Sequence, residues 1–100
     1  MVLLRSSEVY FAESDGNDVW LATEQGRLRA ATQGLDKLDA ELTDPGFLRV
    51  HRRYVVNLNR VREIERGCKG EMLLIMDGET EDMVPVSRRN AATVRRALGI

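Results

Sequence analysis

The side chains best suited to binding a polyanion gather in two short stretches of this sequence. The first, from Phe47 to Gly67, holds six arginines and one histidine against two glutamates. The second, from Val84 to Ile100, holds four arginines and no acidic residue. The whole chain carries 15 Lys+Arg and 16 Asp+Glu, so its formal net charge is only -1 at pH 7. A positive face on a nearly neutral body indicates local binding of a polyanion such as a nucleic acid.

Arginine suits this chemistry because its planar guanidinium donates two hydrogen bonds at once to a phosphate or a base edge. Two arginine pairs, Arg52-Arg53 and Arg88-Arg89, fall at predicted junctions between elements, from which side chains can project into a groove. The alternative is that the arginines pair with the acidic segments 35–45 and 77–82, since surface ion pairs are common. Charge alone therefore leaves nucleic-acid binding and surface pairing both open.

The residues that enzymes use as nucleophiles and bases are scarce. The chain has one histidine, His51, and one cysteine, Cys68, and no Gly-rich phosphate loop follows a predicted strand. We expect His51 to be a partly buried imidazole that hydrogen-bonds to the backbone, and Cys68 to be an ordinary turn residue. The acidic turn at 77–82 has its glycine in the wrong position for a calcium loop. The sequence therefore predicts no enzyme, no bound metal and no cofactor.

Length and composition indicate one domain, residues 1–100. A chain of 100 residues with 43% hydrophobic residues can bury one modest core. Its longest uncharged apolar run, Met72 to Met76, is far too short to span a membrane, and its first residues lack the apolar core of a secretory signal. A single cysteine fits a reducing compartment. We therefore expect a cytoplasmic protein with no membrane partner.

The apolar pattern along the chain predicts short antiparallel strands. Turn compositions at 14–18 and at Gln25-Gly26 make the first three strands a β-meander. Pro85 places the last strand at the edge of a sheet, because proline has no N–H to donate. Residues 47–58 contain apolar residues that can anchor the segment, but their pattern predicts neither a strand nor a helix. The predicted strands are 8–13, 19–23, 27–31, 60–65, 72–76 and 83–86.

Two segments have the spacing of helices. Leucines at i, i+3 and i+7 from Leu35 to Leu42 predict a short amphipathic helix, which Thr32 or Gly34 can cap. Ser87 can cap a last helix over residues 88–98. The expected fold class is therefore mainly β, with short antiparallel strands in small sheets and two or three short helices.

The order of residues in the arginine-rich stretch carries a more specific signal. Phe47-Leu-Arg-Val-His-Arg-Arg-Tyr-Val-Val-Asn57, followed by spaced hydrophobic residues, resembles the central motif of the LytTR family of DNA-binding domains. Val84-Pro-Val-Ser-Arg-Arg-Asn90 is similar to the closing motif of that family. The family's opening strand and mid-domain helix match residues 9–14 and 34–38, and the resemblance covers about residues 8 to 98.

This resemblance implies a domain of a transcription regulator, without catalytic residues. Such domains usually follow a receiver domain in two-component response regulators. They bind promoter DNA at paired direct repeats, and their loops enter successive major grooves while the duplex bends. No receiver precedes Met1, so the resemblance implies either an excised domain or a stand-alone member. We expect a monomer in solution, with two copies loaded side by side on double-stranded DNA.

The resemblance also assigns base contacts by position. The family reads bases from the loop between its first two strands, from the residue after the motif histidine, and from the arginine region after Val-Ser. On this chain these positions are Asn17 or Asp18, then Arg52, then Arg89. Arg52 and Arg89 could each bind guanine through O6 and N7. We expect phosphate contacts from Arg53, Arg60 and Arg88.

Three further motif positions, His51, Tyr54 and Asn57, are interpreted as structural, with Asn57 tying loop backbone together. Two positions depart from the family pattern. Arg53 stands where the family usually has serine, and the first loop is acidic. Two other function classes stay open beside DNA binding. One is a protein-interaction or RNA-binding module that uses the same basic patch, and the other is a small hydrolase, for which the sequence offers no motif.

Overall fold

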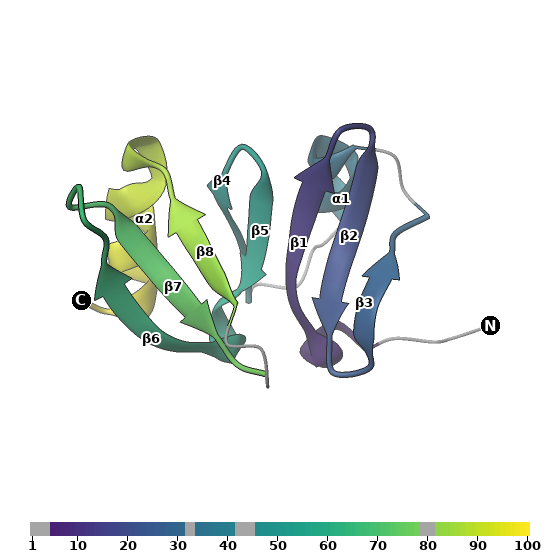
Figure 1. Cartoon of the computed structure of the whole chain (residues 1–100), viewed down its shortest axis with the longest axis horizontal. Helices are drawn as coiled ribbons and strands as arrows, with labels where there is room; N and C mark the ends of the chain where they lie inside the picture. The colour runs from purple at the N-terminus through teal and green to yellow at the C-terminus, as the bar shows by residue number, and fades with distance from the viewer. Residues whose placement is uncertain (1–4, 32–33, 42–45, 79–81) are drawn as a thin grey trace.

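Two antiparallel β-sheets form most of the computed structural model, which describes residues 5–31, 34–41, 46–78 and 82–100 (Figure 1). This architecture confirms the mainly β fold class. The five-stranded sheet has the order β3-β2-β1-β5-β4, and the three-stranded sheet has the order β6-β7-β8. The first contains β1 (Val9–Asp15), β2 (Asp18–Thr23), β3 (Gly26–Arg29), β4 (Phe47–His51) and β5 (Tyr54–Asn57), and the second contains β6 (Val61–Arg66), β7 (Met72–Met76) and β8 (Met83–Val86).

One α-helix lies behind each sheet in the view of Figure 1. Helix α1 (Leu35–Glu41) belongs to the five-stranded sheet, and α2 (Arg88–Leu98) to the three-stranded sheet. Short 3-10 turns, η1 (Ser6–Glu8) and η2 (Leu58–Arg60), precede β1 and β6. No helix in the described ranges is long and apolar enough to cross a membrane.

The predicted β-meander is confirmed, because β1, β2 and β3 pair in chain order. The structure also adds two strands that the sequence pattern did not predict, β4 and β5, which extend the same sheet beyond β1. A β-bulge between Arg49 and His51 breaks the alternation of β4, and polar side chains interrupt its apolar run. Both strands are nonetheless central to the fold, since Val50 and Val55 are fully buried.

The second sheet follows the sequence prediction closely. Strand β8 is an edge strand, as Pro85 indicated, and α2 begins directly after it. Ser87 occupies the N-cap position of α2, but its side chain does not cap the helix. The side-chain amide of Asn90 donates to Ser87 Oγ at 2.7 Å, which occupies the hydroxyl that was expected to bind a backbone N–H. At the other end, Gly99 ends the helix in the left-handed region, with φ +76°.

The buried residues form two clusters, one on each face of the five-stranded sheet. The larger lies between the two sheets and α2, and contains Phe11, Val56, Leu74, Val84 and Val94 among its members. The smaller lies under α1, where Leu35 and Leu38 pack on Ala12, Val19 and Val55. The helical leucine pattern is thereby confirmed for its first two members. Leu42 and the proposed cap Thr32 lie outside the described residues.

Candidate nucleic-acid interface

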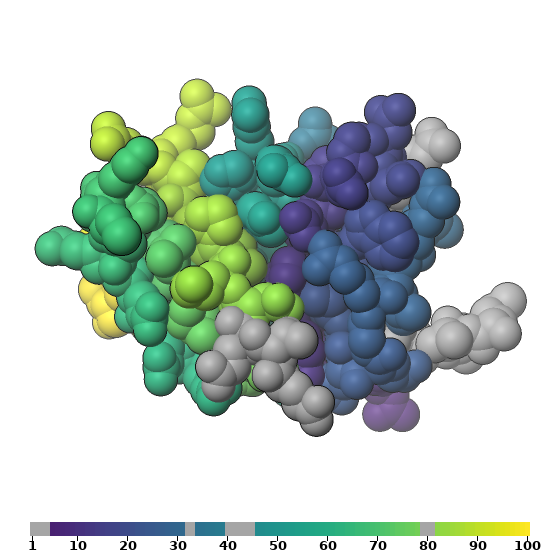
Figure 2. Space-filling view, in the orientation of Figure 1, coloured from purple at the N-terminus to yellow at the C-terminus, as the bar shows by residue number. Residues whose placement is uncertain are grey.

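Three turns lie along one edge of the molecule, the upper edge in Figure 1. They are the β1–β2 turn, the β4–β5 turn and the junction between β8 and α2. The same segments stand out from that edge in the space-filling view of Figure 2. The three predicted base-reading regions, at Asn17, Arg52 and Arg89, belong to one turn each. Residues far apart in the sequence are thus brought to a common edge.

The β4–β5 turn is held in shape by Arg49, a residue that the sequence interpretation did not single out. Arg49 Nε donates to the carbonyl oxygen of His51 at 2.9 Å, and its Nη2 donates to that of Arg52. Its Nη1 binds Asp36 Oδ1 of α1 at 2.7 Å. One guanidinium therefore fixes two consecutive carbonyls of the turn and connects them to α1. The sequence signal for this role is weak, since it consists only of the position of Arg49 between the apolar residues Leu48 and Val50.

His51 braces the same turn from inside. Its Nδ1 accepts a hydrogen bond from the backbone N–H of Arg53 at 3.1 Å, and its ring meets that of Tyr54 edge-on at 5.6 Å between centroids. Burial lowers the pKa of His51, and the positive charges of Arg52, Arg53 and Arg49 lower it further. The imidazole is therefore neutral near pH 7, which is the state in which Nδ1 can accept.

Arg53 connects the β4–β5 turn to the β1–β2 hairpin. Its carbonyl oxygen accepts from the N–H of Ser14 at 2.9 Å, and its Nε donates to the carbonyl oxygen of Ser14 at 3.2 Å. Its Nη2 lies 3.8 Å from Glu13 Oε2, and the side chain is 49% exposed. Tyr54 donates to the same carboxylate at 3.2 Å, and burial and the charge of Glu13 raise the pKa of Tyr54. Arg53 is thus anchored but keeps half of its surface in solvent.

The β1–β2 turn presents Asn17 as its exposed polar residue. The turn consists of Gly16 and Asn17, and Gly16 adopts φ +62°, a conformation that glycine accepts without strain. Asp18 follows at the start of β2, where Arg29 of β3 forms an ion pair with its carboxylate. That pair offsets the negative charge of Asp18, which would otherwise repel a phosphate. Of the two predicted candidates in this loop, Asn17 has the more accessible side chain.

The junction between β8 and α2 supplies two exposed arginines. Arg88 and Arg89 are the first residues of α2, where the helix dipole adds partial positive charge. A hollow of about 480 Å³ lies between this junction and the β4–β5 turn, and Arg52 and Arg89 both line it. Within the described ranges, Arg52, Arg88 and Arg89 form no ion pair. Their guanidinium groups are therefore available to an anionic ligand.

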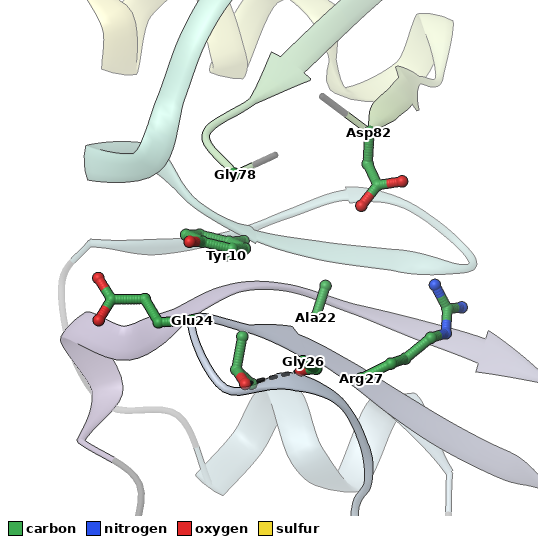
Figure 3. A pocket seen from close by; sticks show the side chains of 8 residues that line it. Tyr10, Ala22, Glu24, Gly26, Arg27, Gly78 and Asp82 are labelled. Atoms are coloured by element: carbon green, nitrogen blue, oxygen red, sulfur yellow. Dashed lines mark hydrogen bonds between the residues drawn. The ribbon is translucent and has the colours of Figure 1, made fainter. Parts of the chain in front are cut away.

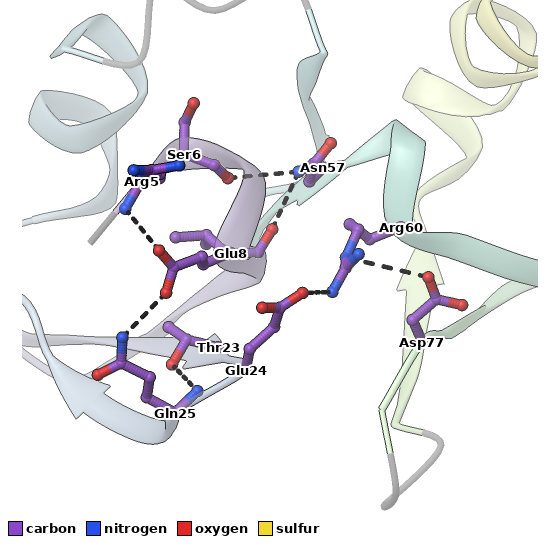
Figure 4. Close-up of polar contacts among 10 residues, drawn as sticks. Arg5, Ser6, Glu8, Thr23, Glu24, Gln25, Asn57, Arg60 and Asp77 are labelled. Atoms are coloured by element: carbon purple, nitrogen blue, oxygen red, sulfur yellow. Dashed lines mark hydrogen bonds and ion pairs between the residues drawn. The ribbon is translucent and has the colours of Figure 1, made fainter.

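Arg60, the third arginine expected at phosphate, lies apart from this edge. Glu24 of the β2–β3 turn forms an ion pair with its Nη2, and Asp77 lies 3.9 Å from its Nε (Figure 4). The guanidinium carbon lies 4.8 Å from the ring centroid of Tyr10. The side chain is only 26% exposed. These groups occupy Arg60 between the two sheets, so a phosphate would have to displace two carboxylates to reach its guanidinium.

Asn57 also makes internal contacts. Its Nδ2 donates to the carbonyl oxygens of Val9 at 3.0 Å and Ser6 at 3.4 Å, and its Oδ1 accepts from the N–H of Asn59 at 3.1 Å. The residue is 4% exposed, so these bonds satisfy an amide that is hidden from water. Figure 4 shows it beside η1, with its amide directed at the first strand. These contacts hold the end of β5 against the start of β1.

A separate hollow of about 540 Å³ opens between β1–β3 and the end of β7 (Figure 3). Tyr10 and Ala22 line it together with the charged side chains of Glu24, Arg27 and Asp82. None of its lining residues belongs to the three turns, and carboxylates outnumber cations around it. This hollow is therefore separate from the edge that carries the three turns. Among the described residues, no group of three or more His, Cys, Asp or Glu side chains could hold a metal ion.

Known DNA-binding domains resemble this chain over nearly its whole length. The family model of the LytTr DNA-binding domain matches residues 1–99. A solved structure, the LytTr DNA-binding domain of a putative methyl-accepting/DNA response regulator from Bacillus cereus, superposes with a TM-score of 0.84 at 25% identity, covering 99% of this chain and 88% of that chain.

Two curated regulators align over nearly all of this chain but over less than half of their own. The CO-responsive transcriptional regulator RcoM of Rhodospirillum rubrum is 35% identical, covering 92% of this chain and 38% of RcoM. The transcriptional regulatory protein BtsR of Escherichia coli K12 is 32% identical, covering 98% of this chain and 39% of BtsR. The chain therefore spans about two fifths of the length of these relatives.

Proposed function

Because the chain belongs to the LytTR family of DNA-binding domains, we propose that it binds specific sequences of double-stranded DNA and thereby regulates transcription. The observation that carries the proposal is the pair Arg52 and Arg89. They line one hollow on the turn-bearing edge, and neither forms an ion pair within the described ranges. Two exposed guanidinium groups on a braced backbone suit the O6 and N7 acceptors of guanine, which lie together in the major groove.

The other side chains of the edge divide between base and backbone contacts. Asn17 projects from the β1–β2 turn, and an amide is the side chain that pairs with adenine N6 and N7. Asp18 would contact a base only by exchanging Arg29 for the amino group of cytosine, so we place it second. Arg53 and Arg88 are exposed and positively charged, and we assign them to phosphates that fix the register of the domain on the duplex.

Three turns that follow one another along one edge suit a domain that lies along the duplex. We propose that turns of this edge enter successive major grooves, which repeat about every 34–36 Å along B-DNA. We propose that two copies bind two repeats in the same orientation, each presenting this edge to the DNA.

Double-stranded RNA fits the same edge less well. Its major groove is deep and narrow, so side chains on turns cannot reach base edges there. A protein-interaction role for the basic patch remains the other alternative, and it predicts no preference among DNA sequences. We further propose that the domain acts in the cytoplasm, where bacterial promoters lie, and that a receiver domain N-terminal to it would transmit its signal through this domain.

Selection of bound duplexes from a random pool tests the proposal directly. We expect the unchanged protein to enrich a site that contains two copies of one motif in the same orientation. Selection with Arg52→Ala or Arg89→Ala should leave the motif recognisable but degenerate at one base position. The matched control is Arg96→Ala, an exposed arginine in the last turn of α2, which should return the original motif. A pool without enrichment, or equal enrichment of RNA duplexes, would overturn the proposal.

A further inference from the structure

The two strands with open edges at the ends of the molecule carry matching triplets of opposite charge. Strand β3 ends the five-stranded sheet, and β6 ends the three-stranded sheet. The two strands lie at opposite ends of the long axis in Figure 1. The triplet on β3 is Arg27-Leu28-Arg29, and the triplet on β6 is Glu63-Ile64-Glu65. Each has an aliphatic residue between two residues of one charge.

The side chains of the two triplets also point to corresponding faces. Leu28 pairs with Leu21, which packs with the cluster under α1, so Arg27 and Arg29 lie on the opposite face of the sheet. On β6, Ile64 pairs with Leu74 on the α2 side, so Glu63 and Glu65 lie on the opposite face. Both helices lie behind their sheets in Figure 1, so both charged faces are turned to the viewer.

We propose that β3 of one copy of this chain pairs with β6 of a second copy, so that copies associate head to tail through a continuous sheet. An open strand edge presents unpaired N–H and C=O groups that a second strand can satisfy. Leu28 then lies beside Ile64, which is 39% exposed and is one of the large hydrophobic residues left at the surface. Each arginine meets a glutamate. Because both triplets are symmetric, this match holds for parallel and for antiparallel pairing.

The same charges exclude the competing pairings. Two β3 edges would place Arg opposite Arg, and two β6 edges would place Glu opposite Glu, and like charges in cross-strand pairs are destabilising. Charged edge strands commonly prevent association altogether, but here they prevent only association of like edges. A contact between two different surfaces leaves one unused edge of each kind on a pair of copies, so further copies can add head to tail. Successive copies joined in this way are related head to tail by one repeated operation.

The residues involved can accept the second partner without a large rearrangement. Arg27 and Arg29 pair with Glu13 and Asp18 on their own sheet, but their side chains are 50% and 64% exposed. Within the described part of the chain, Glu63 and Glu65 have no ion pair, and both are exposed. The carboxylates of β6 are therefore available, and exposed arginines can bind two carboxylates.

The contact is small, because β3 has only four residues. Association is accordingly weak between separate molecules, and becomes substantial when two copies are held close together. Binding sites on one scaffold create effective concentrations on the order of mM. The interface itself needs no DNA, so it can be tested independently of the proposed function. On two DNA sites in the same orientation it would favour occupancy of the second site.

Disulfide trapping tests the pairing between separate molecules. Leu28→Cys and Ile64→Cys are prepared as separate chains of different mass, both with Cys68→Ser, mixed without DNA and oxidised mildly. We expect the mixed covalent dimer to exceed each homodimer by about tenfold or more, because only β3–β6 pairing brings positions 28 and 64 together. A statistical mixture of the three dimers, or no covalent dimer, would overturn the proposal.

Charge reversal tests the specificity of the same contact. Adding Glu63→Arg and Glu65→Arg to the Ile64→Cys chain should reduce the mixed dimer about tenfold. Adding Arg27→Glu and Arg29→Glu to the Leu28→Cys partner should restore it, with circular dichroism confirming that this chain is folded. The matched control is Asp15→Arg, an exposed acid outside both edges, which should leave the yield unchanged. Failure of folded partners to restore the dimer would refute the charge match, while the DNA selection would be unaffected.

Discussion

The backbone N–H of Ser87 donates a hydrogen bond to the carbonyl oxygen of Val50 at 2.9 Å. This bond joins the end of β8 to β4, and so connects the two sheets at the turn-bearing edge. Arg52 lies two residues after Val50, and Arg89 lies two residues after Ser87. The two arginines proposed to read bases are thus fixed relative to each other through a short backbone link, with Val50 itself fully buried.

Substitution of these two arginines should change specificity more than stability. For Arg52→Ala and Arg89→Ala, we expect a loss of about 1–3 kcal/mol on the preferred site, because each removes a bidentate contact to one base. On a duplex altered at that base, the variant and the unchanged protein should bind almost equally. Titration of both duplexes by fluorescence anisotropy measures this difference. An unchanged affinity and base preference in both variants would place the reading surface elsewhere.

Arg49→Ala should weaken DNA binding although Arg49 itself makes no contact in the proposal. Its guanidinium holds the carbonyls of His51 and Arg52, so its loss frees the turn that carries Arg52. We expect faster hydrogen exchange at the amides of residues 51–54 and a DNA affinity lower by about 1 kcal/mol or more, since a bond to a charged group is lost and the turn must be ordered on binding.

The salt dependence of binding separates this bracing role from a direct contact. A residue that neutralises a phosphate contributes about 0.9 to the slope of log K against log salt, whereas a residue that only braces the turn contributes nothing. Arg49→Ala should therefore keep the slope of the unchanged protein. Arg88→Ala, at an exposed position proposed to contact phosphate, is the comparison and should lower it by about 1. A fall in slope for Arg49→Ala would mean that Arg49 binds the DNA backbone.

The sequence predicted the strands whose apolar residues lie between clear turn signals and missed the two whose pattern basic residues interrupt. The β1–β2–β3 meander, the edge strand with Pro85 and the helix after Ser87 were all identified from local residue types. Strands β4 and β5 were not, because a bulge and a run of basic residues obscure the alternation around Val50. Their position in the middle of the fold depends on pairing between β1 and β5, which is set by distant parts of the chain.

In the candidate site too, some residues could be predicted from the local sequence and others could not. Residue type and motif order brought Arg52, Arg53 and Arg89 forward, and all three lie on the turn-bearing edge. Nothing local distinguished Arg60 from them, since its partners Glu24 and Asp77 come from other turns. The supporting role of Arg49 likewise depends on contacts across the β4–β5 turn and with α1. Which arginine faces solvent is a tertiary property that composition does not encode.

The stability of the fold should decrease as the pH falls below 6.5, because of His51. Its pKa in the folded protein lies below the ordinary value of 6.5, so the unfolded chain binds more protons between those two values. The contribution is therefore complete above pH 6.5 and is lost as the pH falls through the folded pKa. Protonation also removes the acceptor that Nδ1 offers to the N–H of Arg53. Urea unfolding at pH 7.5 and 5.8 measures the effect.

The matched variant for this measurement is His51→Gln, which fills a similar volume without titrating in this range. Since the chain has one histidine, the difference in unfolding free energy between the two pH values should shrink in the variant. An equal difference in both proteins would assign the pH dependence to carboxylates. DNA binding should shift the pKa of His51 in the opposite direction, because nearby phosphates favour the protonated imidazole. Binding should therefore take up protons between pH 5.8 and 7.5.

Arg60→Ala should mainly lower stability, whereas Arg53→Ala should mainly weaken DNA binding. Arg60 lies between the sheets with Glu24, Asp77 and the ring of Tyr10, so its removal should cost about 1–2 kcal/mol of unfolding free energy, from the lost cation–π contact and ion pairs. Its effect on the salt slope of DNA binding should be negligible. Arg53→Ala should cost less stability, weaken binding to all duplexes alike and lower the slope by about 1.

The distinction between these two arginines depends on where each guanidinium lies in the fold. Arg53 keeps half of its side chain in solvent beside the predicted reading turn, whereas Arg60 keeps about a quarter and is surrounded by carboxylates. If Arg60 bound a phosphate instead, Glu24 and Asp77 would be left without their cation. Their negative charges would then lie next to an approaching polyanion, which opposes binding. A loss of salt slope in Arg60→Ala equal to that in Arg53→Ala, with stability preserved, would show that Arg60 leaves its partners when DNA binds.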